Sequence, residues 1–133
     1  GEESVQEAIQ ALELANDVYR LPRLSNEEMA ILYSAASALI FPSTFEGGGI
    51  PVIEAMACRC PVVAAELPVI REFAHSVPLY VNPESTSSIC EKMMRMQSDE
   101  NLQTQVANQG IQRAQYFSGR HVINKLQAVY DEL

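Results

Sequence analysis

The chain contains segments in which apolar residues recur at helical spacing and short runs that are apolar throughout. The first predicted helix opens at Ser4, with Glu7 three residues later as a capping box. Its apolar positions are Val5, Ile9, Leu12 and Ala15. A second capping box, Ser25 with Glu28, opens a helix with apolar positions at Met29, Leu32, Tyr33 and Ala36.

Four short β-rich or apolar runs predict strands at residues 18–21, 38–41, 61–65 and 79–81. The runs at 38–41 and 61–65 carry no charge, as is typical of strands buried on both faces of a parallel sheet. Between them, Pro51 suits the first turn of a helix that continues through Ala57. Strands that alternate with helices indicate βαβ units, so we predict the α/β class with a doubly wound parallel sheet.

From Glu84 onward the pattern is helical and forms three apolar stripes. The stripes are Ile89, Met93 and Met96, then Leu102 and Val106, and finally Val122, Leu126 and Val129. Ser118 is a candidate cap for the last helix. Three successive helices cannot all cover a four-stranded sheet, so we expect one to reach toward another domain or chain.

Composition narrows the classes of function. At 133 residues and 47% apolar content the chain suits one globular domain. Its net charge of −8 and the absence of a Lys/Arg cluster argue against nucleic acid as a partner. No run reaches the roughly 20 apolar residues of a membrane span. The chain begins at Gly1 without an export leader, so we expect a cytoplasmic protein.

The pattern of cysteine, histidine and aspartate residues also gives no support for a metal-binding protein. Cys58, Cys60 and Cys90 form no CxxC pair, and neither histidine stands near a cysteine in sequence. We expect these cysteines to be small buried thiols. The aspartates form no pairs, so we predict no metal site.

The strongest candidate for chemistry is the loop that follows the run at 38–41. Ligands of doubly wound sheets bind at the carboxyl ends of the strands, where this loop begins. Three consecutive glycines, residues 47–49, leave backbone N–H groups open to a ligand, and the following helix directs its positive end at the same space. Glu46 and Glu54 flank the glycines and can accept hydrogen bonds from vicinal hydroxyls. Spacing alone supports equally a plain loop with solvated carboxylates.

The segment from Phe41 to Cys58, FPSTFEGGGIPVIEAMAC, resembles the signature of family 4 retaining glycosyltransferases, with their E-x7-E motif. The resemblance continues through Pro61-Val62-Val63-Ala64, Glu72 and residues 79–83, and covers nearly the whole chain after Asp17. It implies a Rossmann-like, donor-binding C-terminal domain of a GT-B fold. Residues 1–133 would be one partial domain, truncated at its N-terminal side, and the N-terminal acceptor domain would be missing.

The same resemblance implies roles for individual residues. Glu46 would be catalytic and contact the donor sugar near the reacting carbon. Gly48, Gly49 and Ile50 would offer backbone N–H groups to the sugar hydroxyls. Glu54 would bind the ribose of the nucleotide. Arg23, in the turn beside the nucleobase, would stack on the base, although a solvated turn arginine is an equally supported interpretation.

The resemblance further implies a nucleotide-sugar donor as substrate, a glycan, lipid or small-molecule acceptor, retention of anomeric configuration, and no metal or other cofactor. The sequence departs from the family pattern in three places. Gly48 replaces a usual aromatic residue, Arg59 replaces a usual glycine, and residues 66–72 lack the usual glycine pair before Glu72. We expect Arg59 to cap the carbonyl end of the helix or to pair with an acid, and we favour this structural role over phosphate binding. The only lysines, Lys92 and Lys125, are far from the motif, so the family's phosphate-binding cations would lie upstream. The isolated chain would then be inactive.

Two alternatives remain open: a non-catalytic GT-B-like interaction or regulatory module, and a nucleotide-sugar epimerase with a similar two-domain fold. The last apolar stripe would dock on the missing domain, or would form a dimer through the C-terminal helix when the chain is alone. Peripheral attachment of the full-length protein to a membrane is also compatible with the sequence.

Overall fold

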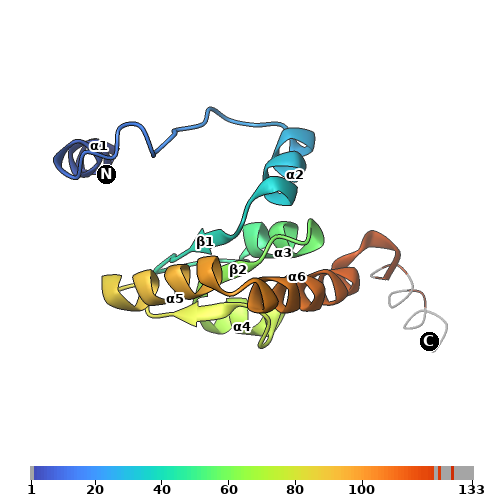
Figure 1. Ribbon diagram of the computed structural model, residues 1–133. Coiled ribbons are helices and arrows are strands. Elements are labelled where there is room, and N and C mark those ends of the chain that lie inside the picture. The colour runs from blue at the N-terminus through green and yellow to red at the C-terminus, as the bar shows by residue number, and fades with distance from the viewer. Residues whose placement is uncertain (1, 122, 124–126, 128–133) are drawn as a thin grey trace.

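A computed structural model describes residues 2–121, 123 and 127. The elements are α1 (Glu2–Ala11), α2 (Asn26–Ala35), β1 (Leu39–Phe41), α3 (Ile50–Ala57), β2 (Val62–Ala65), α4 (Pro68–Ala74), β3 (Leu79–Val81), α5 (Thr86–Ser98), α6 (Glu100–Ala114) and the 3₁₀ turn η1 (Gln115–Phe117). Figure 1 shows α1 apart from the sheet, joined to α2 by a long connection.

The three strands form one parallel sheet in the order β1-β2-β3. Leu39 pairs with Val62, and Val63 pairs with Leu79. Helix α3 connects β1 to β2, and α4 connects β2 to β3, which are the crossovers that parallel strands require. The predicted α/β class is confirmed, with helices on both faces of the sheet.

Alternate residues of the strands serve two separate cores, because successive side chains of a strand point to opposite faces. Val62 and Ala64 pack with Met56 of α3 and Ile70 of α4. On the other face, the core is formed by Val63, Val81, Met96 and Val106. All four residues of β2 are fully buried, as the uncharged run at 61–65 predicted.

The strand predicted at residues 18–21 is wrong. This run has no regular secondary structure and its residues are exposed. A strand exists only through hydrogen bonds to a neighbour, and no neighbouring strand pairs with this run in the described part of the chain. The sheet described therefore has three strands instead of four, and β1 is only partly buried.

The helix starts agree in part with the predictions. The capping box at α2 is confirmed: Ser25 Oγ accepts a hydrogen bond from the Glu28 backbone N–H, and the Glu28 carboxylate accepts one from the Ser25 N–H. Helix α1 begins at Glu2, before the predicted cap Ser4, and ends at Ala11 instead of Ala15.

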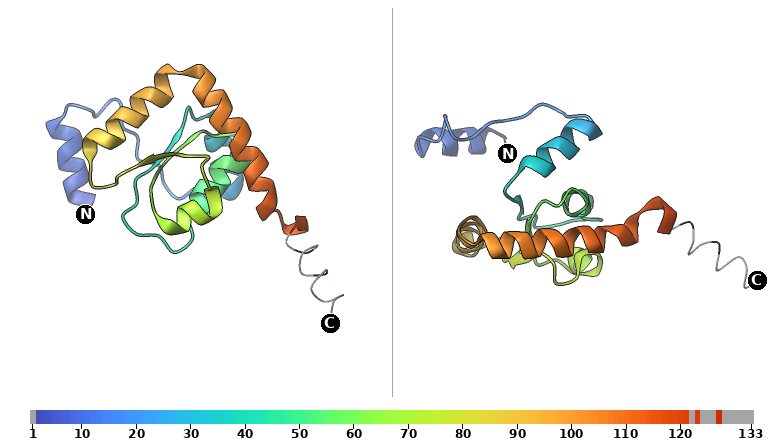
Figure 2. Two further views of the ribbon diagram at one scale, coloured as in Figure 1. Left: turned by 90° about the horizontal axis from the view of Figure 1, so that it is seen from below. Right: turned by 45° about the vertical axis from the view of Figure 1, so that its right-hand side comes forward.

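Helices α5 and α6 follow β3 and meet at a sharp bend (Figure 2). Asp99 ends α5 and also caps α6, because its carboxylate accepts a hydrogen bond from the Leu102 N–H at 2.9 Å. Met96 and Val106 are buried, as their stripes predicted, but Met93 is 43% exposed. The positions of the third stripe, Val122, Leu126 and Val129, lie outside the described residues.

The cysteine prediction holds for one residue of three. Cys60 is buried, Cys58 is partly buried and Cys90 is exposed on α5, and all three are free thiols. Separately, no helix in the described residues combines the length and apolar character that a bilayer span needs.

Candidate functional site

The glycine loop lies between β1 and α3, at the carboxyl end of β1. Gly49 ends the loop in the left-handed conformation, with φ 58°, and directly precedes the helix. A side chain there would be strained, and its Cβ would meet Ile70 Cγ1 at 3.4 Å. Gly47 and Gly48 have open space around them, apart from Ile50 Cγ1 at 3.8 Å from a Cβ at Gly48. The backbone of Gly47 and Gly48 is therefore accessible in front of the α3 N-terminus, whose unpaired N–H groups favour anionic or oxygen-rich ligands.

Glu46 is held in this loop by a neighbouring hydroxyl. Ser43 Oγ donates a hydrogen bond to Glu46 Oε1 at 2.7 Å and also lies 3.1 Å from the carbonyl oxygen of Phe45. Glu46 and Ser43 are partly buried, whereas Phe45 is exposed. One carboxylate oxygen therefore has a hydrogen-bond partner, and no hydrogen bond to the other is found among the described residues.

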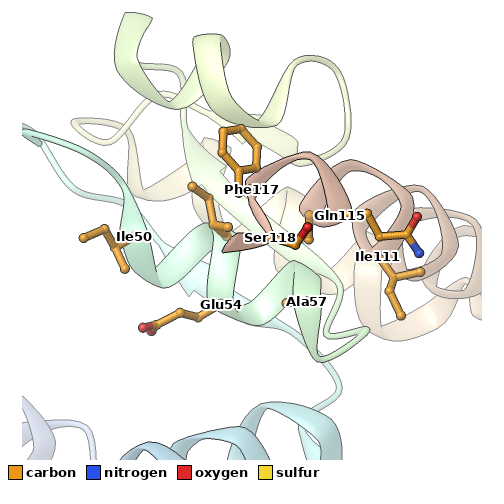
Figure 3. A pocket seen from close by; sticks show the side chains of 9 residues that line it. Ile50, Glu54, Ala57, Ile111, Gln115, Phe117 and Ser118 are labelled. Carbon is orange, nitrogen blue, oxygen red and sulfur yellow. The ribbon is translucent and has the colours of Figure 1, made fainter. Parts of the chain in front are cut away.

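Glu54 lies on the exposed side of α3 and borders two pockets. One, of about 390 Å³, lies between α3 and the end of α6, where Ile50, Ile53 and Phe117 also line it. Figure 3 shows the Glu54 carboxylate pointing away from Phe117 and Ser118.

The second pocket, of about 290 Å³, lies between α2 and α3, and Asn26 and Tyr33 line it with Glu54. Burial raises the pKa of the Tyr33 hydroxyl, and the nearby Glu54 carboxylate raises it further.

The predicted site residues fall into two groups. Glu46, Gly48, Gly49, Ile50 and Glu54 lie on one continuous loop and helix, as the motif required. Arg23 is exposed in the connection before α2, and among the described residues no hydrogen bond or ion pair joins it to that loop. Asn26, three residues later, does share the α2–α3 pocket with Glu54.

Cations and metal ligands are sparse around the loop. Arg71 is paired with Glu66 and lies over the Tyr80 ring at 3.8 Å, while Lys92 is paired with Glu91. Arg113 donates to the backbone carbonyl of Phe73 at 2.6 Å. In the described residues, no group of three or more His, Cys, Asp or Glu side chains could hold a metal ion.

Arg59 makes a structural contact, but neither of the two contacts expected of it. It follows α3 with φ 59°, in the left-handed region that favours glycine, and its guanidinium donates to Asn108 Oδ1 of α6 at 2.8 Å. Its partner is an amide and not a carbonyl end or an acid.

The sequence pattern did not predict that two further residues, Ser43 and Tyr33, lie at the site. Ser43 could have been noticed as a hydroxyl three residues before Glu46, a spacing at which serine commonly bonds its own loop. Tyr33 was assigned to a helical apolar stripe, and nothing in its local pattern indicates that α2 brings it beside Glu54.

Comparisons with known proteins identify the family of the chain. The family described as glycosyl transferases group 1 matches residues 1–113. The chain is 46% identical over 85 residues to the O-antigen chain mannosyltransferase RfbU of Salmonella typhimurium, an alignment that covers 64% of this chain and 24% of that protein. It is 29% identical over 93 residues to the O-antigen chain mannosyltransferase B of Escherichia coli, which covers 70% of this chain and 24% of the relative.

Among solved structures, the fold is similar to that of sucrose-phosphate synthase from Thermosynechococcus elongatus, with a TM-score of 0.87 and 24% identity. That match covers 98% of this chain and 33% of the synthase. The chain thus spans about a quarter of the length of the two mannosyltransferases and a third of the synthase. On the match over residues 1–113, the chain belongs to the glycosyl transferases group 1 family.

Proposed function

We propose that this chain is the donor-binding part of a glycosyltransferase that moves a sugar from a nucleotide-sugar donor to an acceptor. The observation that carries the proposal is the loop of Glu46 to Gly49, which leads into α3 at the carboxyl end of β1 and has a second carboxylate, Glu54, one turn into the helix. Such a loop and helix start suit a ligand with hydroxyls and phosphates.

In this proposal each part of the donor has its own contacts. The backbone N–H groups of Gly48, Gly49 and Ile50 bind hydroxyls of the donor sugar. Glu54 accepts hydrogen bonds from the ribose diol, a role that carboxylates fill in other nucleotide sites. Arg23 stacks on the nucleobase after a movement of the connection before α2, since the structure leaves it exposed.

The proposed reaction breaks the bond between the anomeric carbon and the phosphate oxygen, and the nucleoside diphosphate leaves with the electron pair. The acceptor hydroxyl oxygen bonds to the same carbon from the same face, and its proton passes to the leaving phosphate. Glu46 stabilises the positive charge that develops on the sugar, because a carboxylate already held in place favours a developing positive charge beside it. Retention of configuration and the absence of a metal from this scheme are taken from the family 4 retaining glycosyltransferases, whose signature the E-x7-E segment resembles.

Mannose is the first donor sugar to test, because two relatives are named mannosyltransferases. The acceptor is a glycan, a lipid or a small molecule. We propose a cytoplasmic enzyme, with peripheral attachment to a membrane if the acceptor is a lipid.

The test is calorimetric titration of the full-length protein with UDP-, GDP- and ADP-mannose. Glu54→Ala should weaken binding of the preferred donor by roughly 1–3 kcal/mol, since it removes charge-assisted hydrogen bonds to the ribose. Glu100→Ala, which removes an exposed carboxylate from the first turn of α6, is the matched control and should bind as the wild type does. Equal affinity of wild type and Glu54→Ala would contradict the assignment.

A second variant separates an enzyme from a non-catalytic module of the same fold. Glu46→Gln keeps the size of the side chain and its bond to Ser43 but removes the charge. Transfer should fall by roughly a hundredfold or more while donor binding is kept. Unchanged turnover in this variant would remove Glu46 from the catalytic role.

A further inference from the structure

One apolar side chain of the candidate site is unusually open to solvent. Phe45, directly before Glu46, is 85% exposed, the highest value among the large exposed hydrophobic residues in the described part of the chain. It is also the only aromatic residue of the loop between β1 and α3. Burying a phenylalanine releases water from apolar surface, so a ligand that covers this ring gains binding free energy from the contact.

The position of this ring is linked to that of Glu46. The Ser43 hydroxyl donates its one proton to Glu46 Oε1 at 2.7 Å, and the Phe45 carbonyl oxygen lies 3.1 Å from the same hydroxyl. The backbone that carries the phenyl ring therefore lies close to the hydroxyl that holds the carboxylate.

The chemistry of the neighbouring side chains limits which class of ligand can bind beside Phe45. Residues 42–45 are Pro, Ser, Thr and Phe, which offer hydroxyls and an aromatic ring but no cation. A phosphate would lack a charged partner there, whereas a pyranose presents hydroxyls at its edge and an apolar C–H face.

The Phe45 ring also lies outside the pockets around Glu54, the residue that the proposed function assigns to the nucleotide. Neither of the two pockets that Glu54 borders includes Phe45. In the proposed function, the donor sugar is bound by backbone groups that follow Glu46 in the chain, at residues 48–50. Phe45 precedes Glu46 in the chain and is not among these proposed donor contacts.

We infer that Phe45 packs against the apolar face of a pyranose ring of the acceptor and determines acceptor affinity. This inference rests on the proposed function, because it takes Glu46 as the group beside the reacting carbon. It assigns to the chain a carbohydrate acceptor and adds a specificity-determining residue outside the glutamate and glycine positions.

The test uses the full-length enzyme, its preferred mannosyl donor, and the methyl glycosides of mannose, glucose, galactose and rhamnose as acceptor probes. Phe45→Ala should raise KM for the accepted glycoside roughly tenfold, with KM for the donor unchanged in the acceptor-free hydrolysis of the donor. Phe45→Tyr keeps the ring and should stay within about threefold of the wild type. Ile31→Ala, which trims a side chain 69% exposed on α2, is the control for loss of open apolar surface.

The outcomes separate this inference from the proposed function. If Glu46→Gln abolishes transfer but Phe45→Ala leaves acceptor KM unchanged, the function stands and the inference is wrong. If Phe45→Ala raises the donor KM, or lowers the melting temperature and both affinities together, the ring serves the donor or the packing and the inference is also wrong. Failure of every pyranoside as an acceptor would overturn it as well. Unchanged turnover in Glu46→Gln contradicts the proposed function itself.

Discussion

At the scale of single residues, the candidate site depends on short local contacts within one loop. The Ser43 hydroxyl orients Glu46 through a 2.7 Å hydrogen bond, and the left-handed Gly49 turns the chain into α3. Ser43 and Gly49 both lie within three residues of Glu46 in sequence. These local contacts help to fix the shape of the loop.

We predict that Ser43→Ala lowers kcat/KM of the full-length enzyme on the order of tenfold. The variant loses a hydrogen bond to a charged group and lets the Glu46 carboxylate rotate. The control is Ser34→Ala, because Ser34 also donates a local bond, to the Ala30 carbonyl oxygen within α2, but lies outside the loop. Steady-state kinetics on both variants decide the matter, and equal activity of the two would show that Ser43 does not orient Glu46.

At the scale of elements, helix α2 shows how a cap couples stability to pH. The Glu28 carboxylate accepts the Ser25 backbone N–H at 2.8 Å, and this bond, with that to the Ser25 side chain, lowers the pKa of Glu28. A carboxylate with a lowered pKa in the folded state stabilises the fold above its unfolded pKa, roughly 4.3. That contribution is lost as the pH falls through the lowered folded pKa.

We therefore predict that Glu28→Ala lowers the urea midpoint at pH 7 and that its difference from the wild type shrinks as the pH falls below about 4. Glu27→Ala is matched in helix position and charge but lacks the bond to Ser25, so it should change the midpoint less. Urea unfolding followed by circular dichroism at pH 7, 5 and 3 measures both effects. A difference that stays constant across these pH values would argue against the cap as its source.

At the scale of the whole molecule, α6 packs against α3 and so supports the helix that carries Glu54. Gly110 of α6 makes this approach possible, because a Cβ there would lie 3.2 Å from Met56 Cγ and 3.5 Å from Met56 Cα. Met56 is fully buried and also packs in the core that α3 and α4 form with the sheet. Residues far apart in the sequence thus meet at one contact.

We predict that Gly110→Val destabilises the protein by about 1–3 kcal/mol, since the branched side chain overpacks a filled core. Gln109→Val places the same residue on the exposed neighbouring position of α6 and should change stability by less than about 0.5 kcal/mol. Urea unfolding of the two variants gives the comparison. If the two variants were equally stable, the close approach of α3 and α6 at Gly110 would not contribute to the stability of the fold.

Much of the fold was predictable because its signals are local. The buried run of β2 and the cap of α2 agree with the structure, and so does the helix after Pro51. The strand at residues 18–21 was not predictable in the same way, since β-propensity indicates a strand only where a partner is available. The roles of Glu46, Glu54 and Arg23 toward a donor remain predictions.

By itself, the sequence determined the class of the fold and the family of the chain, along with the order of carboxylate, glycines and helix in the candidate site. These features depend on residue order over short distances, through periodicity and the conformational freedom of glycine. Only the tertiary structure decided that Tyr33 and Glu54 share a pocket, that Phe45 stays exposed, and that Gly110 touches Met56. Those facts depend on how helices far apart in the chain pack together, and packing is set by the whole core rather than by any local pattern.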